Sequence, residues 1–357
     1  MDEETRKILA NEGDYQINLF GERVRIDEKN KLFEKFVIPP FSVLDTRQGY
    51  WQDRKRAWIR GLKIQSELGR NKTKAMGTWS GSVPGYYDKK AAVERELGES
   101  LTNTQFETKY LPILLANSSL AFTDKGGILS IFDPVACELM YRWFCPDKGE
   151  ILDPFAGGSV RGIIANFLGY KYTGIDLNKE QIEENKKQGK IILGEDNIPT
   201  WIYGNSLHID KFYEGKQADF IFSCPPYFDL EQYTDDPEDL SNLDWENFQN
   251  QYKEIIKKVC NLLKNNHFAC FVVSEVRNRE SGEYRNFVGL TIQSFLDCGM
   301  NFWNELILLN TCGSVPMRIS GQFNVSKKIG RIHQNILVFF KGQQENIRNL
   351  IFKKDEN

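Results

Sequence analysis

The chain has 357 residues, of which 41% are hydrophobic and 13% are aromatic. This length and composition predict a folded globular protein of at most two or three domains with a large core. The formal net charge of -3 at pH 7 excludes a uniformly basic protein, so any contact with nucleic acid has to come from local basic clusters.

Cysteine and histidine usage indicates neither disulfides nor a metal site. The seven cysteines are an odd set without CxxC spacing and lie mostly in apolar surroundings, which favours reduced cytosolic thiols. The three histidines, His208, His267 and His333, are far apart in sequence, so we expect no metal centre. The N-terminus is charged, and no run approaches the roughly 18 apolar residues of a transmembrane helix. We therefore expect a cytoplasmic protein without a membrane partner.

Residues 1–126 are predicted to form an N-terminal region that contacts nucleic acid. The stretch 36–74 interleaves aromatic residues with basic ones, among them Arg54 and Arg56. Aromatic rings beside cations suit nucleic-acid backbones and exposed bases, although a solvated basic face explains the pattern about equally well. From 71 to 109, Gly, Ser, Thr and charged residues dominate, which predicts a mobile loop or linker.

From about Gly127 onward, helical and strand patterns alternate, which predicts a mostly parallel sheet with helices on both faces. Asp133 and Pro134 are expected to cap and start the first of these helices. Strands are expected at 150–153, 171–176, 200–204, 218–223, 268–276, 305–310 and 335–342. The last two are joined by a long loop, 312–334, for which we expect no helix, so they are predicted to pair antiparallel.

A glycine turn follows the first of these strands, in the segment DPFAGGS at 153–159. Its glycines let backbone N–H groups approach a ligand, and the helix that follows adds positive potential. Asp176 ends the next strand about 20 residues later, where a carboxylate can accept hydrogen bonds from two ribose hydroxyls. Together they predict a nucleoside cofactor. The turn lacks GxGxxG, which argues against nicotinamide and flavin nucleotides.

The strand at 218–223 runs into Cys224-Pro225-Pro226-Tyr227. Two successive prolines fix two φ angles and remove two backbone donors, so the loop is stiff and presents its carbonyls and the Tyr227 ring. An aromatic ring stacked on a base contributes roughly 1–3 kcal/mol. The segment is therefore a candidate site for a flipped base whose exocyclic amino group donates to the carbonyls.

These motifs should meet, because ligands of parallel α/β sheets bind outside the carboxyl ends of the strands. Asp153, Asp176 and Cys224 each lie at or just past such an end, and so does Asn205, which we expect to meet the adenine ring of the cofactor. One edge of the sheet is the predicted site.

On these motifs, the chain resembles the S-adenosylmethionine-dependent DNA amino-methyltransferases, which methylate adenine N6 or cytosine N4, and within them the phage and prophage DNA methylases. That family typically has DPFAGSG in the turn and a tetrapeptide of Asp, Asn or Ser followed by Pro-Pro and an aromatic; here they stand as DPFAGGS and CPPY. The similarity also covers 36–58, 130–144 and 333–342. It implies a Rossmann-like class I methyltransferase fold at 127–342, followed by a charged tail at 343–357.

The resemblance implies site-specific DNA methylation, as in restriction–modification, with S-adenosylmethionine as cofactor, DNA as partner and no metal. The residues implied in cofactor binding are Phe132, Asp153, Phe155, Gly157, Gly158, Asp176, Leu177 and Asn205. The implied catalytic residues are Cys224, Pro225, Pro226 and Tyr227. DNA contacts are expected from the basic residues Arg54, Arg56, Arg318, Lys327 and Lys328.

Two positions depart from the family pattern. Ser159 replaces the second glycine of the turn, and serine is a good helix cap. Cys224 stands where Asp, Asn or Ser would accept a hydrogen bond from the target amine, and a thiol is a weak acceptor. It fits a small buried residue, a weak acceptor or a nucleophile toward a pyrimidine, so the target base stays open. The alternatives are an RNA or modified-base methyltransferase and a DNA-binding protein with an inactive methyltransferase fold.

Overall fold

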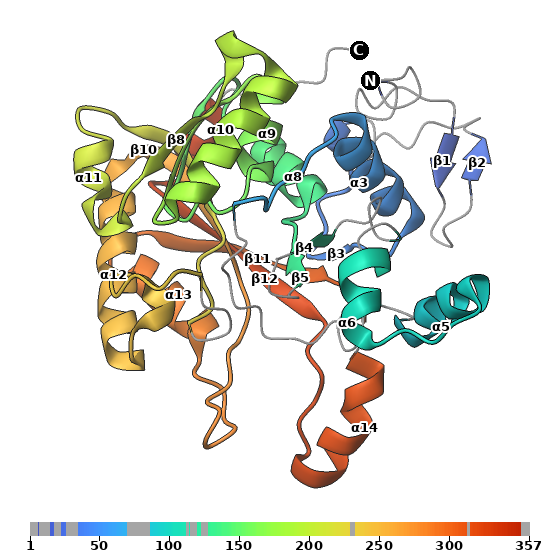
Figure 1. The fold of residues 1–357 in the computed structure, drawn as a ribbon. Helices are drawn as coiled ribbons and strands as arrows, with labels where there is room; N and C mark the ends of the chain where they lie inside the picture. Colours follow the sequence, from blue (N-terminus) through green and yellow to red (C-terminus); the bar gives the residue numbers. More distant parts are fainter. Residues whose placement is uncertain are drawn as a thin grey trace.

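The computed structural model of the chain describes residues 35–69, 86–111, 128–228, 233–312 and 315–350, together with Arg6, Leu114 and three short strands, β1 (Tyr15–Ile17), β2 (Arg23–Arg25) and β4 (Leu120–Phe122). β1 pairs antiparallel with β2, and β4 pairs antiparallel with β5 (Ile128–Ser130). The other described strands form one central sheet of eight (Figure 1).

The order of strands across this sheet is β8 (Thr200–Tyr203), β7 (Lys171–Asp176), β6 (Glu150–Asp153), β9 (Ala218–Ser223), β10 (Leu263–Val273), β12 (His333–Lys341), β11 (Asn301–Leu309) and β3 (Val43–Asp45). The five strands from β8 to β10 are parallel to one another. β12 runs antiparallel to both β10 and β11. The predicted fold class, a Rossmann-like and mostly parallel sheet with an antiparallel last strand, is confirmed.

Helices cover both faces of the sheet because successive strand residues point to opposite sides. In β9, Phe220 and Phe222 pack in the core beneath α8 (Pro134–Phe144) and α9 (Val160–Phe167), whereas Ile221 packs in the core beneath α12 (Trp245–Leu262) and α13 (Phe287–Leu296). Shorter or peripheral helices complete the two layers: α10 (Lys179–Leu193), η2 (Glu195–Asn197), η3 (Ser206–His208), α11 (Ile209–Phe212), η4 (Leu240–Asn242) and η5 (Gln344–Asn349).

The N-terminal region contributes a strand and a helix to this core. β3 lies at the edge of the sheet, parallel to β11, and so adds an eighth strand to the seven expected. α3 (Gly49–Gly61) packs against α8, where Arg54 forms a two-pronged ion pair with Glu138 at 2.6 and 2.7 Å. Trp58 donates a third hydrogen bond to the same carboxylate at 2.9 Å. All three side chains are buried.

The prediction of a mobile loop over 71–109 is wrong for its described part, which begins at Tyr86. Helix α5 (Tyr86–Leu97) is followed by α6 (Asn103–Gln105) and a π-helical turn, η1 (Phe106–Tyr110). Tyr86, Val93 and Phe106 form a small core of their own, and a capping box at Thr102 starts α6. The polar average composition concealed apolar residues at helical spacing.

The loop expected between the last two strands also contains a helix, α14 (Val315–Ser326). Val315, Ile319 and Phe323 recur every four residues, a helical period that the polar surroundings of this segment obscured. Two other boundaries differ from the prediction: β10 begins at Leu263 and β11 at Asn301, each several residues earlier than expected. Among the described helices, none is long and apolar enough to span a membrane.

One carboxylate links three strands at the amino ends of the sheet and predicts a pH dependence. Asp219, in β9, accepts hydrogen bonds from the Glu150 amide at 2.9 Å and from Lys264 Nζ at 2.7 Å. Burial opposes its ionisation, but hydrogen bonds from His267 and Lys264 hold the pKa of Asp219 below its usual value. Its contribution to stability is therefore present above the unfolded-state pKa of about 3.9 and is lost as pH falls from there through the lower folded-state pKa.

Asp219→Asn should accordingly flatten the acid side of the stability curve. Urea unfolding at several pH values between about 5 and 2.5 measures the difference between the two proteins, which should shrink as pH falls. Glu214→Gln, at an exposed position, is the matched control. A constant difference at all these pH values would contradict the assignment.

Candidate functional site

One cavity of about 590 Å³ lies at the carboxyl ends of the parallel strands. It is lined by Phe155 and Gly157 after β6, by Asp176 at the end of β7, by Asn205 after β8 and by the Cys224–Tyr227 segment after β9. The sheet thus brings together strand ends that are far apart in sequence, as expected for this topology. Of the twelve residues predicted for cofactor binding and catalysis, every one except Asp153 lines this cavity.

The glycine turn is held against the end of β7. The Gly157 amide donates to Asp176 Oδ2 at 2.7 Å, and the Ala156 amide donates to the Ile175 carbonyl at 2.8 Å. Gly157 has a φ of 53°, in the left-handed region that glycine adopts at little cost. Ser159 starts α9 but makes no side-chain capping bond, so the predicted cap is wrong. The turn and the Asp176 carboxylate form one rigid rim of the cavity.

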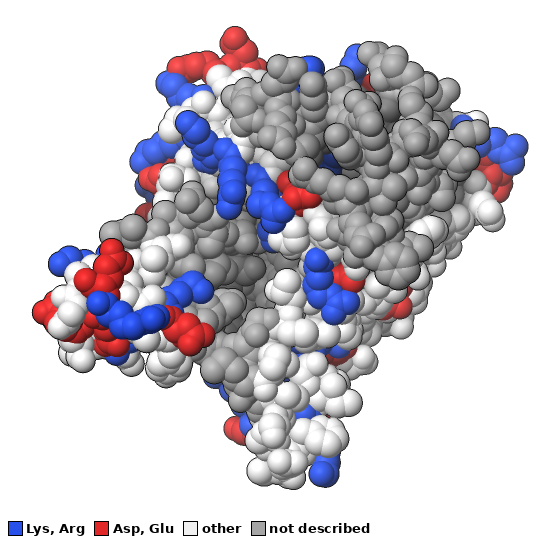
Figure 2. Space-filling model, turned by 90° about the vertical axis from the view of Figure 1, so that its right-hand side faces the viewer, with Lys and Arg blue, Asp and Glu red and all other residues white. Residues whose placement is uncertain are grey.

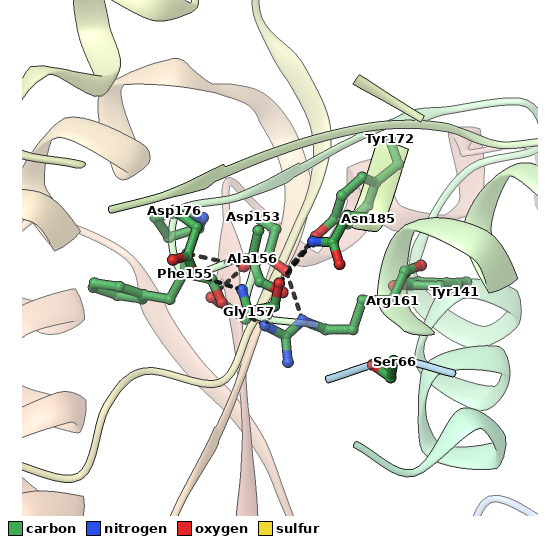
Figure 3. A network of polar contacts seen from close by, with 12 residues as sticks. Ser66, Tyr141, Asp153, Phe155, Ala156, Gly157, Arg161, Tyr172, Asp176 and Asn185 are labelled. Atoms are coloured by element: carbon green, nitrogen blue, oxygen red, sulfur yellow. Dashed lines mark hydrogen bonds and ion pairs between the residues drawn. The ribbon is translucent and has the colours of Figure 1, made fainter. Parts of the chain in front are cut away.

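Asp153 occupies a different place from the one predicted. It is fully buried, and its carboxylate accepts hydrogen bonds from Arg161 Nε at 2.6 Å, Tyr172 at 2.7 Å and Ser223 at 2.5 Å. Figure 3 shows Arg161 reaching from α9 toward Asp153 and the glycine turn. Asp153 therefore ties β6, β7, β9 and α9 together beneath the cavity and does not line it.

Burial and charge act in opposite directions on Arg161. Burial disfavours its charged form, but the Asp153 carboxylate outweighs this and raises the pKa of Arg161 well above its ordinary value. The guanidinium also donates to the Ala156 carbonyl at 2.8 Å and to that of Phe155, and it lies 4.8 Å from the centre of the Phe132 ring. A permanent buried cation thus supports the backbone of the glycine turn.

The Cys224–Tyr227 segment lines the cavity from the end of β9, next to β6 in the sheet. The Tyr227 hydroxyl accepts a hydrogen bond from Gln334 Nε2 at 2.7 Å and lies 3.4 Å from Cys224 Sγ. Its ring meets Phe287 edge-on, with centroids 6.1 Å apart. Burial raises the pKa of Tyr227 well above its ordinary value, so the phenol is neutral. These contacts hold the ring, which is half-buried, in one orientation.

Further cavity residues were not among the predicted site residues. Asn310 and Thr311 follow β11, and Gln334 lies at the start of β12, so the antiparallel end of the sheet supplies part of the wall beside Tyr227. The N-terminal region supplies Thr46, Gln52, Lys55 and Glu67. Thr46, Gln52 and Lys55 fall within the stretch 36–58 that shares the family resemblance, which was the available signal; nothing in the sequence singled out Glu67.

The cavity wall is acidic overall. In the described part of the chain, five carboxylates line it, against two cations. The carboxylates are Glu67, Asp133, Asp176, Glu238 and Asp239, and the cations are Lys55 and Arg161. Lys55 Nζ pairs with Asp133 at 3.1 Å, and Arg161 pairs with Asp153, so both cations are already engaged. The described residues contain no cluster of three His, Cys, Asp or Glu side chains that could hold a metal ion.

The residues predicted to contact DNA are dispersed. Arg54 is buried in its ion pair with Glu138, so the prediction that it contacts DNA is wrong: the guanidinium is committed to the core. Arg56 is exposed and pairs with Asp53. Lys327 is exposed just after α14, and Arg318 lies within that helix. Figure 2 shows the described Lys and Arg side chains of this face in small separate groups, and the lower lobe, where Figure 1 places α14, carries few charges.

Comparisons with known proteins show only low similarity to solved structures. No protein-family model matches the chain, and no curated protein is significantly similar to it. Among solved structures, TrmN from Thermus thermophilus is similar with a TM-score of 0.41 and 11% identity, over 73% of this chain and 80% of that one. Magnesium protoporphyrin IX methyltransferase from Synechocystis PCC 6803, solved with bound SAM, has a TM-score of 0.38 and 10% identity, over 71% of this chain and 97% of that one. An rRNA methylase from Streptococcus thermophilus has a TM-score of 0.37 and 9% identity, over 60% of this chain and 100% of that one.

Proposed function

We propose that this chain is an S-adenosylmethionine-dependent methyltransferase that modifies the exocyclic amino group of a flipped adenine (N6) or cytosine (N4) in DNA. The observation that supports it most is that one cavity joins the glycine turn and Asp176 to the Cys224–Tyr227 segment. The glycine turn and Asp176 suit a nucleoside cofactor, and the Cys224–Tyr227 segment suits a planar base that carries an amino group.

The cavity fits the proposed cofactor in size and charge. Its volume of about 590 Å³ is within the range of roughly 300–1,000 Å³ that is typical of small-molecule sites. The excess of carboxylates in its wall favours a cationic ligand, and S-adenosylmethionine, when bound, supplies an electrophilic methyl group on a sulfonium cation. Asp176 would accept hydrogen bonds from the ribose hydroxyls, while Phe155 and Leu177 would contact the adenine and ribose faces.

The Cys224–Tyr227 segment would bind and orient the target base. Flipping a base costs a few kcal/mol, which stacking on the Tyr227 ring partly offsets. The Pro225 carbonyl would accept a hydrogen bond from the amino group and so aim the nitrogen lone pair into the cavity. Holding the amino nitrogen in line with the sulfonium methyl group would supply most of the rate enhancement. The amine loses a proton after it has gained the methyl group, so no catalytic base is required.

The role of Cys224 differs from that of the acceptor residue common in the resembling family. Its Sγ lies 3.4 Å from the Tyr227 hydroxyl, so in this structure the thiol contacts the stacking residue. A weak acceptor at this position leaves the choice between adenine and cytosine to the rest of the wall, which includes Asn310 and Gln334.

The test is to incubate the purified protein with methyl-labelled S-adenosylmethionine and unmodified duplex DNA, followed by nuclease digestion and mass spectrometry of the nucleosides. We expect labelled N6-methyladenine or N4-methylcytosine. Label on structured RNA alone would select the RNA alternative. Failure to bind S-adenosylmethionine in calorimetry would instead favour a DNA-binding protein with an inactive methyltransferase fold.

A further inference from the structure

A short segment that follows α3 is fastened over the glycine turn; we refer to residues 64–69 as the Glu67 segment. The Ser66 carbonyl accepts hydrogen bonds from the Ser159 amide at 3.4 Å and from Gln181 Nε2 at 2.9 Å. The Gln65 amide donates a hydrogen bond to Gln188 Oε1 at 3.0 Å. The segment is therefore anchored both to the start of α9 and to α10.

Two glycines, Gly69 and Gly158, allow the Glu67 segment to pack closely against its neighbours. A Cβ built on Gly69 would overlap the backbone of Gln181, so the Glu67 segment lies directly on α10. A Cβ built on Gly158 would overlap the Glu67 carboxylate and the Ser66 hydroxyl. The absence of a side chain at Gly158 thus makes room for an acidic side chain from the N-terminal region.

Glu67 brings a buried carboxylate to the cavity wall. The residue is only 4% exposed, yet it lines the cavity, and its Oε1 accepts a hydrogen bond from the Ser66 hydroxyl at 2.9 Å. Its negative charge at this end of the cavity favours a ligand that carries a positive group there.

The glycine turn separates two carboxylates with different surroundings. Asp176, at the end of β7, accepts a hydrogen bond from the Gly157 amide, and the ribose of a nucleoside is expected beside it. Glu67 contacts Gly158 on the side that the N-terminal region forms. A ligand whose nucleoside lies beside Asp176 would place its amino-acid tail between the turn and the Glu67 carboxylate.

We propose that the Glu67 carboxylate binds the α-ammonium group of the methionine end of S-adenosylmethionine, an inference that rests on the proposed function. A charge-assisted hydrogen bond of this kind is short and about twice as strong as a neutral one. Glu67 selects the amino-acid end of the cofactor, and the N-terminal region becomes part of the cofactor site.

The test compares Glu67→Gln with the wild-type chain by calorimetry, using three ligands: S-adenosylhomocysteine, its analogue without the α-amino group, and methylthioadenosine, which lacks the amino-acid group. The isosteric substitution should lower the affinity for S-adenosylhomocysteine about 10- to 100-fold. Neither of the other two ligands contains the ammonium group, so their affinities should change by less than about twofold. Glu214→Gln, at an exposed position, should leave all three unchanged.

Two kinds of failure are distinguishable. An equal loss for all three ligands, or no loss for any of them, would overturn the role of Glu67 and leave the cofactor assignment intact. A wild-type chain that binds neither S-adenosylmethionine nor S-adenosylhomocysteine would overturn the proposed function itself. If Glu67→Gln does not fold, Glu67→Asp provides the same comparison, because a shorter side chain withdraws the carboxylate from the ammonium group and should again weaken only S-adenosylhomocysteine.

Discussion

Replacing Asp153 with alanine is expected to lower the free energy of unfolding by about 3–5 kcal/mol. The carboxylate is fully buried and pairs with Arg161, which is only 5% exposed. Its removal leaves a buried guanidinium without its counterion, and it also removes the acceptor of the Tyr172 and Ser223 hydroxyls. A loss of this size is a large fraction of the stability of an ordinary domain.

Urea unfolding monitored by circular dichroism measures this change, with Asp147→Ala at an exposed position as the matched control. The double variant Asp153→Ala/Arg161→Ala separates the ion pair from the other hydrogen bonds, because it removes both charges together. Its loss of unfolding free energy should be smaller than the sum of the losses of the two single variants. A loss below about 1 kcal/mol for Asp153→Ala would show that the network does not hold the strand ends together.

Tyr227→Ala should reduce kcat/KM for DNA methylation about 10- to 100-fold while leaving the affinity for S-adenosylhomocysteine nearly unchanged. The expected loss corresponds to the roughly 1–3 kcal/mol of a base stacked on an aromatic ring. The proposed cofactor contacts come from the glycine turn and Asp176 and do not involve Tyr227, so we expect them to survive the substitution. Single-turnover methylation and calorimetry measure the two quantities separately.

Tyr227→Phe separates the ring from its hydroxyl. It keeps the stacking surface but loses the hydrogen bond from Gln334 at 2.7 Å and the contact with Cys224, so a loss of less than about tenfold is expected. Tyr87→Ala, on α5 at a residue that is 59% exposed, is the matched control and should have no effect. Parallel losses of turnover and cofactor affinity in Tyr227→Ala would refute the assignment of Tyr227 to the target base.

Much of the fold was predictable because its signals are local. The strands that became β6 to β9 are short apolar runs bounded by turns, and their boundaries agree with the structure to within about one residue. The glycine turn and the Cys224–Tyr227 segment were recognisable for the same reason, since the backbone properties of glycine and proline act where those residues stand. The convergence of these segments also followed from the sequence, because a parallel sheet aligns the carboxyl ends of its strands.

The errors about Arg54 and Asp153 concern side chains whose partners lie in other elements of the fold. Arg54 belonged to a basic stretch that is typical of nucleic-acid contacts, but Glu138, 84 positions away, pairs with it in the core. Asp153 meets Arg161 only because the glycine turn brings α9 back over the end of β6. It meets Tyr172 and Ser223 because β7 and β9 lie on either side of β6 in the sheet. The charge of a side chain is evident from the sequence, but its burial and its partner are not.

The sequence alone determined the strands at 150–223, the glycine turn with Asp176, and the stiff Cys224–Tyr227 loop, because each follows from periodicity or backbone chemistry within a few residues. Only the tertiary structure decided that Asp153 lies beneath the cavity, and that Glu67 and Gln334 lie in its wall. The physical reason is that these three positions depend on side-chain packing between different elements of the fold, and the local sequence around each residue does not show which side chains it will meet.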